Sequence, residues 1–118
     1  MFSMITPGSF FSMLSDSTRL RILMLVQAED EVCVCELTYT LDESQPKISR
    51  HLALMREAGI VESRREGTWM FYRIHQGLPG WAKEIIRRVF DQLTGLNPYC
   101  DDRAQVSQMS NRPESHCV

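Results

Sequence analysis

The chain has 118 residues, which is enough for one domain with one hydrophobic core and too few for two. Hydrophobic residues make up 43% and charged residues 24%, as is ordinary for a globular protein, and the net charge of −2 argues against a general polyanion binder. No apolar run approaches membrane-spanning length and no leader pattern is visible, so we expect a cytoplasmic protein without membrane contact. In that reducing compartment the four cysteines are expected to be free thiols or metal ligands.

The first half of the chain predicts three helices. Phe10 and Phe11 give a short helix within residues 1–14 an aromatic face. Arg19–Gln27 is almost continuously apolar, which predicts a buried central helix after a segment rich in capping residues. A third helix is expected from about Cys33 to Leu41, since its apolar residues recur at helical spacing.

The segment from Ser44 to Gly59 predicts a helix with a marked start and end. Ser44 is a good N-cap, and Gly59 stands where a helix stops. Its buried side is predicted from apolar residues at i, i+4 and i+7: Ile48, Leu52 and Met55. Its first half carries side chains that can reach bases and phosphates, and we take these as DNA-binding residues: Gln45, Lys47, Ser49, Arg50 and His51. Two short helices, the second polar at its start, indicate a helix-turn-helix.

Residues 60–65 and 68–74 predict two strands joined at Glu66-Gly67, which would form a wing after the helix-turn-helix. Residues 44–73 hold six bases against three acids, whereas residues 29–43 hold six acids and no Lys or Arg. A DNA-binding surface is therefore expected in the second block. Arg64 and Arg65 are expected to contact the DNA backbone or the minor groove.

A last helix is expected at about Trp81–Leu93, and its apolar stripe is wider than a monomer of this size readily covers. We therefore predict a homodimer through the first and last helices. The fold class is mainly α with a β-hairpin wing (α+β), a winged helix-turn-helix with about five helices. Residues 1–96 are expected to be the DNA-binding and dimerisation domain, and the polar residues 97–118 a mobile C-terminal tail.

The resemblance to a known family rests on four segments: residues 14–23, 33–37, 44–52 and the hairpin that ends at Tyr72-Arg73. Over residues 10–93 they resemble the ArsR/SmtB family of winged-helix metalloregulatory repressors, and most closely its arsenic-responsive ArsR branch. The resemblance implies a homodimeric repressor, not an enzyme, that binds operator DNA of an arsenic-resistance operon and needs no cofactor. It further implies release from the operator when trivalent arsenic or antimony binds Cys33 and Cys35. The last helix has no histidine, so the Asp and His zinc or cobalt site of another branch is not expected.

The third arsenic ligand stays open, because relatives with three ligands have a cysteine where this chain has Thr38. Cys100 or Cys117 from the tail, a small-molecule thiol, or the methyl group of methylarsenite could complete the site. Residues two apart point about 200° away from each other in a regular helix, so we expect arsenic to unwind the helix start and shift the Ser44 helix. The nearby acids are expected to keep both thiols protonated.

Three other interpretations of the function are open. Cys33 and Cys35 could form a redox switch in a winged-helix repressor that is released by oxidants. A thiol-disulfide enzyme is disfavoured because no βαβ unit is visible around the cysteines. A winged helix that binds only proteins is disfavoured by the polar start of the Ser44 helix.

Overall fold

The computed structural model describes residues 5–109, which form six helices and a three-stranded sheet. The helices, in chain order, are α1 (Pro7–Leu14), α2 (Ser17–Glu29), α3 (Val34–Leu41), α4 (Gln45–Glu57), α5 (Gly80–Leu93) and α6 (Tyr99–Ser107). The strands are β1 (Val32–Cys33), β2 (Val61–Glu66) and β3 (Trp69–Ile74). Within these residues, none of the helices has the length and apolar character that crossing a membrane requires.

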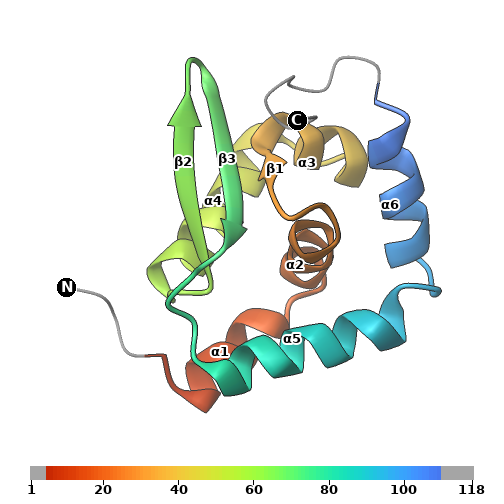
Figure 1. Ribbon diagram of the computed structural model, residues 1–118. Coiled ribbons are helices and arrows are strands. Elements are labelled where there is room, and N and C mark those ends of the chain that lie inside the picture. The colour runs from red at the N-terminus through yellow and green to blue at the C-terminus, as the bar shows by residue number, and fades with distance from the viewer. Residues whose placement is uncertain (1–4, 110–118) are drawn as a thin grey trace.

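The core is built around α2, whose residues Ile22–Val26 are all buried. Figure 1 shows this helix at the centre, with the sheet on one side, α6 on the other, and α1 and α5 beneath it. Asp16 caps α2 by accepting a hydrogen bond from the Arg19 amide, so the helix begins at Ser17, two residues earlier than predicted. The expectation of a buried central helix is confirmed.

The helix-turn-helix consists of α3 and α4. Ser44 is the N-cap of α4, and its side chain accepts a hydrogen bond from the Lys47 amide. The predicted inward stripe of α4 is fully or almost fully buried: Ile48, Leu52 and Met55. Asp42 takes a left-handed conformation with φ 55° at the end of α3, which turns the chain sharply into α4.

The wing is the antiparallel pair β2–β3, and the strand order in the sheet is β1–β3–β2. Glu66 still pairs with Trp69, so the turn lies at Gly67-Thr68, one residue later than predicted. Gly67 has φ 62°, a conformation that glycine adopts without steric cost. The sequence did not indicate β1, a short strand that pairs Val32 and Cys33 with β3 and places the start of α3 against the wing.

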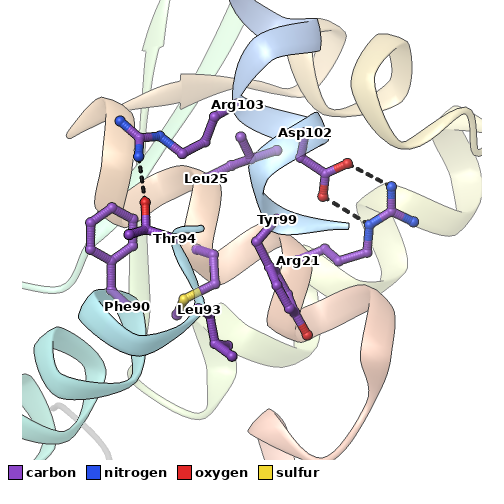
Figure 2. Close-up of a pocket in the computed structure, with 9 residues that line it drawn as sticks. Arg21, Leu25, Phe90, Leu93, Thr94, Tyr99, Asp102 and Arg103 are labelled. Carbon is purple, nitrogen blue, oxygen red and sulfur yellow. Dashed lines mark hydrogen bonds and ion pairs between the residues drawn. The ribbon is translucent and has the colours of Figure 1, made fainter. Parts of the chain in front are cut away.

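The predicted mobile tail from residue 97 is wrong for residues 99–107, which form α6 and pack against α2 and α3. Val106 is fully buried in the core, and Asp102 is almost fully buried. Figure 2 shows how the helix is held: both carboxylate oxygens of Asp102 accept hydrogen bonds from Arg21 of α2, at 2.9 and 2.7 Å. Polar composition misled the prediction, because one ion pair and the packing of Val106 and Tyr99 against the core are enough to dock a short helix. The rest of the expected tail, residues 110–118 with Cys117, lies outside the described residues.

Candidate functional site

The exposed surface of α4 carries the predicted base-reading residues. Gln45 and Arg50 are exposed, and the Gln45 amide donates a hydrogen bond to Ser49 Oγ at 3.1 Å, one turn along the helix. Lys47 forms an ion pair of 3.1 Å with Glu43. Because Arg50 and Gln45 project from the N-terminal half of an exposed helix, they suit contact with base edges in a major groove.

His51 differs from the other predicted DNA-binding residues, since its side chain is only 12% exposed. Its Nδ1 lies 3.4 Å from the Arg19 guanidinium, and its Nε2 lies 4.0 Å from Asp16 at the start of α2. Burial lowers the pKa of the imidazole below its usual value, which favours a neutral ring at pH 7. The structure thus places His51 between α4 and α2, where it helps to fix the angle of the recognition helix.

The two wing arginines lie on opposite faces of β2, because side chains alternate along a strand. Arg65 is exposed, and no hydrogen bond or ion pair restrains it among residues 5–109. Arg64 is also exposed, but its guanidinium bonds both carboxylate oxygens of Glu31 and one of Glu66. Arg65 is therefore the wing residue better placed to bind a DNA phosphate.

Cys33 and Cys35 are already together, with their sulfurs 3.2 Å apart. Cys33 lies outside the helix: it ends β1 and is the N-cap of α3, with extended backbone angles of φ −89° and ψ 152°. The expectation that helical geometry separates the two thiols is wrong, because only Cys35 is helical. No unwinding of α3 is needed to bring both sulfurs to one atom.

The distance between the sulfurs suits a shared soft ligand. It exceeds the roughly 2.05 Å of a disulfide bond, so both cysteines are free thiols. With bonds of about 2.3 Å, the zinc–thiolate length, two sulfurs 3.2 Å apart subtend an angle of about 90° at a shared atom. Such an angle fits a pyramidal three-coordinate centre better than a tetrahedral one.

The surroundings keep the Cys35 thiol protonated. Burial is the main reason that its pKa rises to about 12, followed by the hydrogen bond to Cys33, the charge of Cys33 and the charge of Glu36. The prediction of a protonated thiol has the right direction for Cys35, but burial raises its pKa more than the nearby acids do. Free Cys35 therefore has very little thiolate at neutral pH.

Glu36 holds the cysteine pair in place and was missed as a functional residue. Its side chain is fully buried, and its carboxylate accepts a hydrogen bond from the Cys33 amide at 2.8 Å. A Glu three residues after an N-cap is half of the capping-box pattern. That spacing was readable from the sequence, but cysteine is an unusual N-cap, so the pattern gave a weak signal.

No third protein ligand joins the pair among residues 5–109, which contain no group of three or more His, Cys, Asp or Glu that could hold a metal. The Thr38 hydroxyl donates to the Cys35 carbonyl oxygen at 3.0 Å. Cys100 is exposed on α6. The predicted ligand Cys117 lies outside the described residues, so its role stays a prediction.

Comparison with known proteins agrees with this arrangement of helices and wing. The family described as "Bacterial regulatory protein, arsR family" matches residues 16–63. The Arsenic resistance transcriptional regulator ArsR1 of Pseudomonas putida is 46% identical over 94% of this chain and 85% of its own length. The chain belongs to the ArsR family. The Arsenical resistance operon repressor of Escherichia coli is 49% identical to this ArsR-family chain over 71% of the chain and 72% of the relative.

The fold is also that of solved winged-helix regulators. HlyU from Vibrio cholerae superposes with a TM-score of 0.65 at 28% identity, covering 73% of this chain and 89% of that one. The predictions of the ArsR family, of a winged helix-turn-helix, and of a DNA-binding regulator that is not an enzyme are therefore confirmed. The family match ends at residue 63, so α6 lies beyond the matched segment.

Proposed function

We propose that this ArsR-family protein represses an arsenic-resistance operon and leaves its operator when trivalent arsenic or antimony binds Cys33 and Cys35. The observation that carries the proposal is the pair of sulfurs 3.2 Å apart at the start of α3, the helix that precedes the recognition helix. Two relatives named for arsenic resistance, at 46% and 49% identity, support the choice of metalloid.

The ligation step is balanced without any other reactant. Arsenous acid, As(OH)₃, exchanges two hydroxides for the two sulfurs, and each hydroxide leaves as water with one thiol proton. Methylarsenite, CH₃As(OH)₂, loses both of its hydroxides in the same way and is then fully coordinated. Because two thiols complete the coordination of the arsenic in methylarsenite, Cys33 and Cys35 can bind it without a third protein ligand. Arsenite bound to the same two thiols would keep one hydroxide or take an external thiol as its third ligand.

Cys35 is poorly suited to start a redox switch. Peroxide oxidation begins with attack by a thiolate, and Cys35, with a pKa raised to about 12, supplies almost none at neutral pH. Ligation of arsenous acid avoids this obstacle, since the departing hydroxide takes up the thiol proton. The redox repressor stays the alternative to the arsenic sensor, and a comparison of hydrogen peroxide with arsenite separates the two.

The proposed repressor is a homodimer through α1 and α5. Phe11 and Trp81 remain 50% and 40% exposed, and both make edge contacts with the buried Phe10 ring, at 5.3 and 5.4 Å between centroids. Two large aromatic side chains on adjacent helices form an apolar patch that a second copy would cover. A symmetric dimer would present its two α4 helices to half-sites one turn of DNA apart, roughly 34–36 Å.

The test measures operator binding by fluorescence anisotropy on the DNA upstream of the gene, with arsenite, methylarsenite or hydrogen peroxide added separately. Cys33→Ser and Cys35→Ser should bind DNA as the parent does and should not respond to either arsenical. Cys100→Ser is the matched control and should respond normally. Release of Cys33→Ser at the parent's arsenite concentration would refute the sensor site, and release by peroxide alone would favour the redox reading.

A further inference from the structure

Arg64 joins the wing to the segment that leads into the cysteine pair. Its Nε and one terminal nitrogen donate to the two carboxylate oxygens of Glu31 at 2.7 and 2.8 Å. Glu31 stands immediately before β1, whereas Arg64 is on β2. The sheet order is β1–β3–β2, so the Arg64 side chain reaches across the central strand to connect the two outer ones.

Cys33, one of the two proposed arsenic ligands (the sensor pair, Cys33 and Cys35), lies on the same face of the sheet as Arg64. Cys33 of β1 pairs with Phe71 of β3, and Phe71 pairs with Arg64 of β2. Residues that pair directly share one face of a sheet, so these three side chains form a row. The Arg64 guanidinium lies over the Phe71 ring, 4.6 Å from its centroid, and Phe71 is fully buried. The row therefore runs from Cys33 on β1 through Phe71 on β3 to Arg64 on β2.

The sequence predicts that arsenic acts by unwinding the start of α3. That unwinding is not required, because the sulfurs are already close enough to share a ligand. The sensor pair instead lies at the junction of α3 with the sheet that carries the wing. In Figure 1, β1 lies beside β3 and leads directly into α3. Ligation at Cys33 can thus act on the wing through the strands as well as on α4 through α3.

We propose that the Arg64–Glu31 ion pair couples ligation of the cysteine pair to the position of the wing, and so sets how strongly the inducer weakens DNA binding. This inference rests on the proposed arsenic-responsive function. In this proposal a ligand that bridges the two sulfurs restrains Cys33, and Glu31, two residues earlier, is restrained with it. The bidentate contact between Glu31 and Arg64 then passes this restraint to β2. An exposed ion pair of this kind contributes little to stability, so variants that remove it should keep the fold.

The chain offers a matched pair of variants, because Arg64 has two carboxylate partners. Glu31→Gln removes the charge and one of the two acceptor oxygens from the connection to β1, whereas Glu66→Gln removes the same charge from the contact at 2.7 Å within the wing. For each variant, the operator dissociation constant is measured with and without saturating methylarsenite, and the ratio is the coupling. Binding of methylarsenite to the free protein is measured separately by equilibrium dialysis.

Glu31→Gln should bind methylarsenite as the parent does and should lower the coupling ratio by at least about fivefold, the low end of ordinary allosteric coupling. Glu66→Gln should keep the parent's ratio. Arg64→Lys keeps the charge but cannot form the planar bidentate contact, so its coupling ratio should match that of Glu31→Gln. Equal ratios for all variants and the parent, or equal losses in both glutamine variants, would overturn the coupling role. A parent that fails to bind methylarsenite would instead refute the proposed function, and the coupling with it.

Discussion

Replacing Asp102 by alanine should show that α6 is an integral part of the fold. Asp102 is 5% exposed at its side chain and accepts two hydrogen bonds from Arg21, whose side chain is 26% exposed. Breaking a buried ion pair on one side costs about 3–5 kcal/mol. Because a quarter of Arg21 already faces water, which can replace part of the lost interaction, we expect a loss of about 2–3 kcal/mol in the free energy of unfolding.

The matching loss in melting temperature follows from the size of the chain. At an unfolding entropy of about 2.1 cal/mol/K per residue, the melting temperature of a chain of 118 residues falls by about 4 °C for each kcal/mol lost from the free energy of unfolding. Asp102→Ala should therefore melt about 8–12 °C lower by circular dichroism at a fixed protein concentration. Asp101→Ala is the control, since this neighbour is exposed in the same first turn and should cost under about 1 kcal/mol. Equal melting temperatures for both variants would refute the docked position of α6.

Four further predictions concern function and assembly. Arg50→Ala should weaken specific operator binding by about 1–3 kcal/mol in a gel-shift titration. Arg65→Ala should weaken specific and non-specific DNA alike and reduce the salt slope by about one, and a loss confined to the operator would contradict a phosphate contact. Because the pKa of Cys35 is raised to about 12, a divalent cation such as cadmium must displace its proton at any lower pH. Cadmium affinity measured by calorimetry should therefore rise about tenfold per pH unit from this group, whereas arsenite affinity should stay flat between pH 6 and 8 because hydroxide leaves with the proton. Phe11→Glu with Trp81→Glu should give a monomer at micromolar concentration by light scattering, and an unchanged dimer would place the interface elsewhere.

The sequence by itself determined the elements whose signals are local. The N-cap Ser44, the inward stripe of α4 and the turn at Gly67 each depend on residues a few positions apart, and the structure has all three. The same holds for the family, because its motifs are short segments that stay readable without coordinates. These features were predictable because capping, helical spacing and turn conformation are set by the neighbouring residues.

The tertiary structure alone decided how the cysteines, the wing and the last helix relate. Cys33 is extended because β1 pairs with β3, a partner far along the chain, and this pairing places the two sulfurs side by side. Arg64 bonds Glu31 across 33 positions, and Arg21 bonds Asp102 across 81. Such pairings carry no periodic signal, since each depends on which surfaces meet once the core has formed. The sequence therefore identified the cysteine pair, but only the packing of the chain showed how its thiols connect to the wing.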